Sequence, residues 1–223
     1  MNLVMQNETM EVIRNFGTIN QNLVFKQGNV LRTVADAKNV LAKAVLEDEF
    51  PQDFGIYDVG EFINVFNLME EGDVSYYDNH LNISNSSSSI NYYYSDTEML
   101  TNPPEKDLQM PAGEVTFTLT QDILNQLRKA SSALGHKSVI ISAGPESITL
   151  SIVDPKNTTS NTYTIEVSGK WEEMHSNAPR LSLNIDNLKL LPGDYQVEVS
   201  SKLISKFTHT SQDLTYWIAL EKN

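Results

Sequence analysis

The sequence predicts an α+β fold of two similar domains, each with two helices packed on antiparallel sheets and about eight short strands. Three observations predict this class. A strand–helix pattern near residue 10 returns near residue 124, a Gly-Asp pair precedes the closing strands of each half, and a segment with three prolines separates the halves. The 223 residues are enough for two domains of about 110 residues each.

The first half opens with a short strand and a helix in "NLVMQNETMEVIRNFGTIN". Met10, Ile13 and Phe16 recur at helical spacing and predict the buried stripe of that helix, with Arg14 on its flank. A second helix is expected to begin near Asp58, because an aspartate at this position is a typical N-cap.

The closing strands of the first half follow Gly72-Asp73 and centre on residues 81–84 and 90–94. The "SNSSSS" segment between them predicts a flexible hairpin tip.

A connector follows at residues 96–113, where prolines and Gly113 interrupt both the helical and the strand periods. This interruption predicts a first domain over residues 1–95 and a second domain over residues 114–223.

The second half repeats the first. "VTFTLTQDILNQLRKASSAL" predicts a strand and a helix, with Thr120 as N-cap and Asp122 in the first turn. A short second helix is expected after Asp186, and "GDYQVEV" then opens a strand. Alternating runs at residues 203–208 and 214–220 predict the last two strands.

Charge is distributed very unevenly along this chain of net charge −13. Residues 44–105 contain thirteen acidic residues and no lysine or arginine, so the rest of the chain is balanced. Two windows, residues 12–35 and 123–145, contain no carboxylate at all. Each includes most of a predicted helix, so each half presents a helix face that is poor in carboxylates. The simplest interpretation is an ordinary solvated face, but such a face usually mixes both signs of charge, and the small uncharged residues Asn15, Thr18, Asn125 and Ser132 are unusual for it.

Several classes of site are not supported by the sequence. The chain has no cysteine, its four histidines lack the spacing of metal ligands, and no Gly-Lys-Ser/Thr phosphate loop occurs. We therefore expect no cofactor, no metal and no enzymatic activity. No run approaches 18 apolar residues, so no membrane partner is expected.

Element order and local matches together resemble a known family. The segments "IRNFGTIN", "FGIYDVGEFINVFNLM" and "LKLLPGDYQVEV…LTYWIALE" are similar to the sliding clamps of T-even-type bacteriophages, the DNA polymerase processivity factors. The resemblance covers essentially the whole chain, although no single motif is diagnostic. It implies a DNA-clamp fold and a homotrimeric ring that encircles duplex DNA in the cytoplasm of an infected bacterium. It also implies three kinds of protein partner: the replicative DNA polymerase, a clamp loader and late-transcription factors.

The resemblance implies that helices line the hole of the ring. The cations expected to face DNA there are Arg14, Arg128, Lys129, Lys137 and Lys189, with His136 as a weaker candidate. The predicted Asp58–Met69 helix departs from this pattern because it carries Asp58 and Glu61 and no cation.

The resemblance also implies that the ring closes where two edge strands from neighbouring subunits pair. The candidate strands "INYYY" and "YTIEV" have high β-propensity and little charge. The candidate interface residues are Ile90, Tyr92, Tyr94, Tyr163, Ile165 and Val167. The alternative is that both strands are interior.

A pocket beneath the connector of such clamps takes a short hydrophobic peptide of the polymerase or of another client. The candidate pocket residues are Val45, Leu46, Leu100, Leu108, Met110, Trp217 and Ala219. The alternative for Leu100, Leu108 and Met110 is that they only fix the connector in place.

Two other classes of function were weighed. One is an acidic, β-rich phage structural or interaction protein without DNA-encircling activity, which would not need the internal repeat. The other is an enzyme with an unrecognised site, for which the sequence offers no acid–base cluster.

Overall fold

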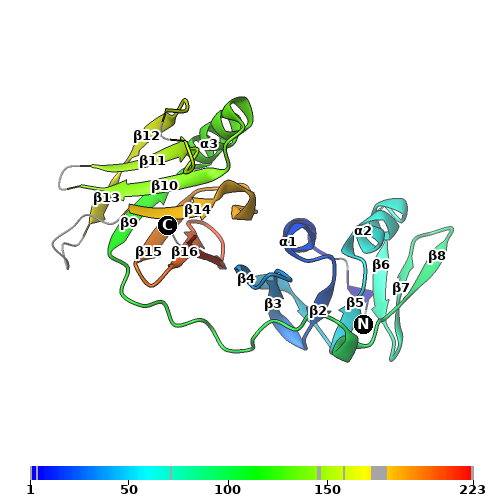
Figure 1. The fold of residues 1–223 in the computed structure, drawn as a ribbon. Coiled ribbons are helices and arrows are strands. Elements are labelled where there is room, and N and C mark those ends of the chain that lie inside the picture. Colours follow the sequence, from blue (N-terminus) through cyan, green and yellow to red (C-terminus); the bar gives the residue numbers. More distant parts are fainter. Residues whose placement is uncertain are drawn as a thin grey trace. The chain divides into compact units, whose positions relative to one another are not determined.

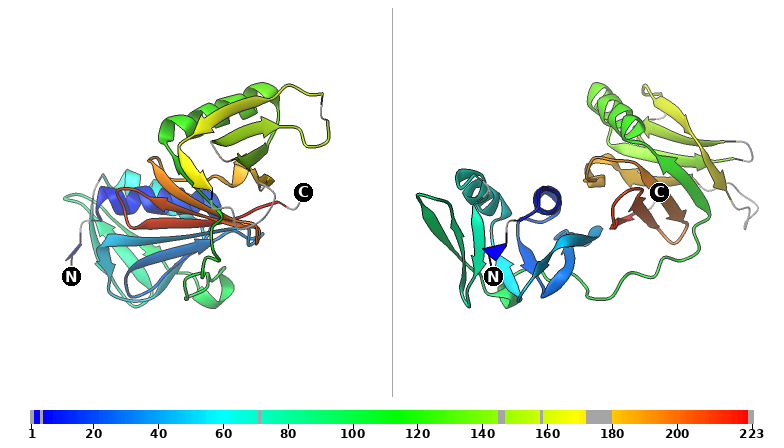
Figure 2. Two further views of the ribbon diagram at one scale, coloured as in Figure 1. Left: turned by 90° about the vertical axis from the view of Figure 1, so that its left-hand side faces the viewer. Right: turned by 180° about the vertical axis from the view of Figure 1, so that it is seen from behind.

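The computed structural model describes residues 2–3, 5–70, 72–144, 147–157, 159–171 and 180–221. It divides into two compact units, Met1–Glu105 and Lys106–Asn223, coloured blue to green and green to red in Figure 1. Each unit combines helices with antiparallel strands, as Figure 2 shows from two further directions.

The first unit contains two α-helices and two groups of strands. The helices are α1 (Asn7–Ile19) and α2 (Val59–Leu68), which pack against each other. One sheet has the order β1-β6-β7-β8, and β4, β3, β2 and β5 lie side by side in a second group. The strand bounds are β1 Asn2–Leu3, β2 Leu23–Phe25, β3 Gly28–Val34, β4 Val40–Phe50, β5 Phe54–Ile56, β6 Asp73–Tyr76, β7 His80–Ser84 and β8 Ser89–Tyr93.

The core of the first unit follows the predicted helical stripe. Met10, Ile13 and Phe16 of α1 are buried. Gly17 lets the two helices approach, because a Cβ at that position would lie 2.7 Å from Cγ1 of Val59. The interior is rich in aromatic contacts. Phe25 stacks on Phe54 with ring centroids 4.5 Å apart.

The second unit contains one α-helix, α3 (Gln121–Leu134), and nine strands among its described residues. One sheet has the order β12-β11-β10-β14, and β13, β9, β15, β16 and β17 lie side by side in a second group. The strand bounds are β9 Val115–Leu119, β10 Ser138–Ala143, β11 Ile148–Val153, β12 Tyr163–Val167, β13 Gly169–Trp171, β14 Arg180–Asn184, β15 Tyr195–Ser200, β16 Ile204–His209 and β17 Leu214–Ala219.

Two N-caps predicted from local sequence are confirmed. Asp58 precedes α2, and its Oδ1 accepts a hydrogen bond from the Glu61 N–H at 3.0 Å. Thr120 precedes α3, and its Oγ1 accepts from the Ile123 N–H at 3.3 Å. The "SNSSSS" segment forms the predicted hairpin tip between β7 and β8.

The short helix predicted after Asp186 in the second half is present as a 3-10 helix that lies earlier in the chain. The chain after β14 makes only a short 3-10 helix, η2 (Ile185–Asn187), so Lys189 lies beyond a helix and not on one. Leu188, Leu190 and Leu191 are all buried while Lys189 is exposed. Residues 188–191 have no regular secondary structure, and Pro192 disfavours a helical conformation at the residue before it.

The connector also contains a short element that the sequence did not predict. The 3-10 helix η1 (Thr97–Met99) begins at Asp96, whose carboxylate accepts from the Glu98 N–H at 2.9 Å. Leu100 follows and is buried against Gly55, where a Cβ would lie 2.7 Å from Cδ1 of Leu100.

Candidate nucleic-acid interface and partner surfaces

A hollow of about 500 Å³ lies at the C-terminal end of α3 in the second unit. It brings together three of the five cations that the sequence assigned to DNA contact. Its lining residues are Arg128, Ser131, Ser132, Gly135, Lys137, Ile185, Asp186, Leu188 and Lys189. We call this hollow the cationic hollow. Lys129 is exposed on α3 but does not line it, and Arg14 belongs to the other unit.

The end of α3 builds one wall of the cationic hollow. Gly135 has the left-handed conformation, with φ of +70°, and its N–H donates to the Ser131 carbonyl at 2.9 Å. The chain therefore turns sharply into β10, and this places Lys137 beside η2. The Ile185 N–H donates to the Lys137 carbonyl at 2.9 Å, which joins the two walls.

The cations of the hollow are held by neutral and acidic partners on the opposite wall. Arg128 Nη2 donates to the Leu188 carbonyl at 2.8 Å. Partial burial lowers the pKa of the Arg128 guanidinium from its ordinary value, but an arginine remains charged in proteins. Lys137 Nζ forms an ion pair with Asp186 Oδ2. With Lys189, the hollow has three cations and one carboxylate and therefore favours an anion.

The helix face of the first unit has a different charge. Arg14 is exposed on α1, and its Nη2 donates to Asn67 Oδ1 of α2 at 3.1 Å. A small hollow of about 230 Å³ beside it also includes Glu70. The exposed face of α2 carries Glu61 and no lysine or arginine, as the sequence indicated. Electrostatic attraction for an anion is therefore concentrated on the second unit.

The two strands expected at subunit contacts both lie at the edge of a sheet. β8 is the terminal strand after β7, and β12 is the terminal strand beside β11, within the part of the chain that the structure describes. The side chains chosen from sequence mostly pack into their own unit. Tyr92 contacts the ring of Phe62 at 5.3 Å, and burial raises the pKa of Tyr92 to about 12.

The remaining predicted interface side chains have similar surroundings. Tyr94 stacks on Phe54 at 5.0 Å, and burial raises the pKa of Tyr94 to about 12. Tyr163 donates from its hydroxyl to Gln126 Oε1 at 2.9 Å. Val167 is buried, while Ile90 and Ile165 are half-buried. The predicted side chains are thus mostly engaged within their own unit, whereas Tyr93 of β8 has 63% of its surface exposed.

The register shows which backbone groups face outward. Tyr94 N–H donates to Asn79 O at 3.0 Å, so these two residues form a hydrogen-bonded pair. Every second pair along the ladder is of the same kind, namely 81 with 92, 83 with 90 and 85 with 88. Because hydrogen-bonded pairs alternate in an antiparallel ladder, even-numbered residues of β8 bond to β7. Asn91 and Tyr93 therefore direct their backbone groups outward.

The same alternation applies to β12. Gly144 N–H donates to Ser147 O at 2.9 Å, which sets the phase of the β10–β11 ladder. Residues 148, 150 and 152 of β11 then bond to their partners on β12, which are residues 167, 165 and 163. Thr164 and Glu166 direct their backbone groups outward. The six residues predicted at the interface have the opposite phase on both strands.

The seven residues expected to form a client pocket have varied surroundings. Leu46, Leu100 and Trp217 are buried, whereas Leu108 has 41% of its surface exposed. Val45, Met110 and Ala219 are half-buried. The cationic hollow, the hollow beside Arg14 and a third hollow of about 710 Å³ in the first unit are lined by none of the seven.

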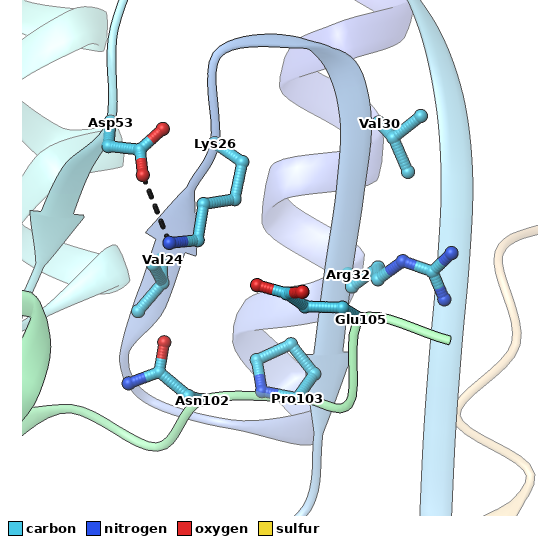
Figure 3. Close-up of a pocket in the computed structure, with 8 residues that line it drawn as sticks. All are labelled: Val24, Lys26, Val30, Arg32, Asp53, Asn102, Pro103 and Glu105. Atoms are coloured by element: carbon cyan, nitrogen blue, oxygen red, sulfur yellow. Dashed lines mark hydrogen bonds and ion pairs between the residues drawn. The ribbon is translucent and has the colours of Figure 1, made fainter. Parts of the chain in front are cut away.

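A hollow of about 710 Å³ in the first unit was missed by sequence reasoning and lies beside the start of the connector (Figure 3). Its lining residues are Val24, Lys26, Val30, Arg32, Asp53, Asn102, Pro103 and Glu105. We call it the connector hollow. The only sequence clue was that Lys26 and Arg32 lie in a carboxylate-free window within the acidic chain.

Hydrogen bonds hold both sides of the connector hollow in place. Thr101 N–H donates to Asn22 Oδ1 at 3.0 Å, and Asn102 Nδ2 donates to the Thr97 carbonyl at 2.8 Å. Across the hollow, Lys26 Nζ contacts Asp53 Oδ2 at 3.0 Å. Hydrogen bonds from the Gln27 N–H and from Lys26 lower the pKa of Asp53 from its ordinary value.

Comparison with known proteins places the chain in a family. The model of the family described as DNA polymerase processivity factor matches residues 6–100. The sliding clamp of Vibrio phage KVP40 is 30% identical over 219 residues, which cover 96% of this chain and 96% of that protein. This chain belongs to the sliding clamp family.

Further relatives agree with the sliding clamp assignment. The sliding clamp of Escherichia phage RB69 is 25% identical over 222 residues, covering 96% of this chain and 95% of that protein. A solved structure of A. fulgidus PCNA with the C-terminal region of FEN-1 bound matches with a TM-score of 0.71 and 10% identity, covering 96% of this chain and 95% of that one. The structural match confirms the predicted DNA-clamp fold, and the relatives confirm the predicted resemblance to T-even-type clamps.

Metal-type clusters and membrane-spanning helices are both absent from the described residues. The described residues contain no group of three or more histidine or acidic side chains placed to hold a metal ion. In the same residues, no helix has the length and apolarity needed to cross a membrane.

Proposed function

We propose that three copies of this sliding clamp close into a ring that encircles duplex DNA and tethers the replicative DNA polymerase for processive synthesis. The observation that carries this proposal is the cationic hollow at the end of α3, on a chain whose net charge is −13. An acidic protein that concentrates Arg128, Lys137 and Lys189 on one surface has a specific place for a polyanion.

The uneven charge suits a ring that slides. A closed ring is retained on DNA by topology, so a few contacts with phosphates suffice. Each tight phosphate contact would steepen the slope of log K against log salt concentration by about 0.9. It would also increase the friction that opposes sliding along DNA. Carboxylates farther than about 8–10 Å from the DNA are largely screened at physiological salt. The acidic segment at residues 44–105 is therefore compatible with DNA binding by the second unit.

Ring closure in this proposal uses backbone pairing between β8 of one subunit and β12 of the next. Both strands lie at sheet edges among the described residues, and both have outward backbone groups in a regular phase. Exposed edges of this kind favour pairing with another chain. The edge position supports the interface that the sequence analysis proposed, with contacts made by the backbone more than by the tyrosine side chains.

Client binding is proposed for the connector and its hollow. The connector hollow has apolar groups from Val24, Val30 and Pro103 and charged groups at its rim, which suits a short chain segment. A client's chain end is what PCNA binds in the FEN-1 complex. We extend that kind of contact to the polymerase of this phage, and Leu108 is exposed enough to add to it.

Other partners are proposed from the family alone. We propose a clamp loader that opens the ring, late-transcription factors that use the ring as a mobile activator, and action inside the infected bacterium. In each case the chain would act by binding and not by catalysis.

Primer extension on a long single-primed circular template tests the function. With the cognate polymerase and loader, the protein should lengthen the products made in one binding event, and its mass in solution should approach three chains. Products of unchanged length, with a loader that hydrolyses ATP and a polymerase that extends the primer without the clamp, would contradict the proposal.

A further inference from the structure

The cationic hollow contains one carboxylate among its three cations. Asp186 Oδ2 is paired with Lys137 Nζ, while Arg128 and Lys189 line the same hollow. A surface that only had to attract DNA would have no use for an acid there, because the acid cancels the charge of its lysine. Asp186 therefore calls for an explanation.

We propose that Asp186 competes with the DNA phosphodiester for Lys137 and so keeps the contact of each subunit with DNA weak. This inference rests on the proposed function, since a weak contact is useful to a ring that must slide. When Asp186 is paired with Lys137, the positive charge that the hollow presents to a phosphate is smaller than its three cations alone would give. A phosphate that enters must displace the carboxylate from the ammonium group.

The exposure of the pair makes competition possible. The side chains of Lys137 and Asp186 have 67% and 57% of their surface exposed. An ion pair in such surroundings contributes little free energy, because water screens both charges. A phosphate can therefore replace the carboxylate, and the carboxylate can return when the phosphate leaves.

Backbone hydrogen bonds keep the competitor in place. Asp186 N–H donates to Asn184 Oδ1 at 3.0 Å, and the neighbouring Ile185 N–H donates to the Lys137 carbonyl at 2.9 Å. The segment that carries the acid is thus fastened to the strand that carries the lysine. Asp186 cannot move far from the hollow when DNA occupies it, so it opposes every phosphate that enters.

The test measures binding of a fluorescent 30-base-pair duplex by the purified protein at several KCl concentrations. Asp186→Asn should bind about threefold or more tightly than the wild type at low salt, because one attractive charge is released. Its plot of log K against log salt should steepen by about 0.9 for each phosphate that Lys137 newly contacts.

Two matched variants separate the local effect from net charge. Asp186→Glu keeps the carboxylate and should bind as the wild type does. Glu198→Gln removes the acid of another ion pair in the same unit, in which Glu198 Oε1 lies 3.0 Å from Lys206 Nζ. Like Asp186→Asn, it removes one negative charge, but at a residue that does not line the hollow. It should therefore leave duplex binding unchanged. Mass and melting temperature confirm that each variant is assembled and folded.

The results for these variants decide whether Asp186 competes with phosphate for Lys137. Tighter binding and a steeper salt dependence for Asp186→Asn alone support the competition. Equal gains for Asp186→Asn and Glu198→Gln would show that net charge is the cause, and no gain for Asp186→Asn would show that Lys137 is not held back. Both results overturn the inference. Retention of the wild-type ring on circular DNA is measured separately, so failure of the proposed function would appear there even if the duplex results hold.

Discussion

Arg128 and Lys129 are neighbours on α3, yet their side chains have different surroundings. Arg128 lines the cationic hollow and donates to the Leu188 carbonyl, whereas Lys129 is exposed outside the hollow. We expect Arg128→Gln to weaken binding of a short duplex several-fold and to reduce the salt slope by about 1. Lys129→Gln should have a smaller effect in the same titration. Equal losses for the two variants would mean that the hollow has no special role.

Glu114 is a second residue with a specific expected effect, here on stability. Its carboxylate accepts from the N–H and the Oγ of Ser201, each at 2.6 Å. Burial on its own would raise the pKa of Glu114, but these hydrogen bonds outweigh it and lower the pKa below its ordinary value. A lowered pKa means that folding favours the ionised form.

The stabilisation by Glu114 is therefore present above the ordinary pKa of a glutamate and is lost as the pH falls through the lowered pKa of the folded state. Glu114→Ala should reduce the free energy of unfolding at pH 7 by about 1–3 kcal/mol, because it leaves the Ser201 N–H without an acceptor. Urea denaturation at pH 7 and pH 3 measures this. A difference between variant and wild type that stays as large at pH 3 would refute the assignment to the ionised carboxylate.

At the scale of elements, the phase of the edge ladder gives a sharp test of ring closure. Asn91 directs its N–H outward from β8, while Tyr92 bonds to β7. Asn91→Pro should dissociate the trimer and leave the unit folded, because proline is tolerated where an edge N–H faces outward. Light scattering over a concentration series measures the mass.

The matched control for that variant is Asn91→Ala. It removes the hydrogen bond between Asn82 Nδ2 and Asn91 Oδ1, which spans 2.7 Å, but it keeps the backbone donor. The alanine variant should remain a trimer. If the proline variant also remains a trimer at micromolar concentration, β8 does not pair with another subunit.

Local signals predicted the elements better than long-range ones. The N-caps at Asp58 and Thr120 and the buried stripe of α1 follow from residues within a few positions of each other, and the structure confirms them. A short helix was expected after Asp186 with Lys189 on it, whereas the helix in the structure ends at Asn187. Tertiary burial of Leu188, Leu190 and Leu191 determines the conformation of the segment that follows.

The candidate sites show the same limit. Arg128, Lys137 and Lys189 were all predicted from sequence, but their meeting around one hollow depends on β10 pairing with β14 across 38 to 46 residues. The connector hollow was missed because it joins residues near 24–32 with residues near 102–105. Contacts between residues so far apart in the chain produce no periodic pattern in a single sequence. The phase of the β8 and β12 ladders was likewise fixed by turns and not by the strands themselves.

At the scale of the whole molecule, a binding experiment can tell which of two proposed regions holds the client. The regions are the connector hollow and the later part of the connector around Leu108 and Met110. A labelled peptide from the C-terminus of the cognate polymerase is titrated against the wild type, Val30→Glu, and the double variant Leu108→Ala with Met110→Ala. If the connector hollow holds the client, Val30→Glu should weaken binding about tenfold, because it places a carboxylate beside the apolar lining. The double variant should then lose less.

The opposite ranking would move the client to the distal connector and leave the connector hollow with a structural role only. Equal affinities for all three proteins, each of trimer mass and with unchanged melting temperature, would remove both regions from the client site.

The start of α3 is held by residues from a distant part of the chain. Gln121 N–H donates to Asp194 Oδ1 at 2.8 Å, and Gly193 N–H donates to Gln121 Oε1 at 2.7 Å, across separations of 73 and 72 residues. A Cβ at Gly193 would lie 2.1 Å from His209 Nε2, so only glycine allows this close approach. The helix is thus fully capped only after the polypeptide has returned to form β15. Amide exchange at the first turn of α3 should therefore share one opening event with β15, and a nascent chain that ends before residue 193 would hold this helix loosely.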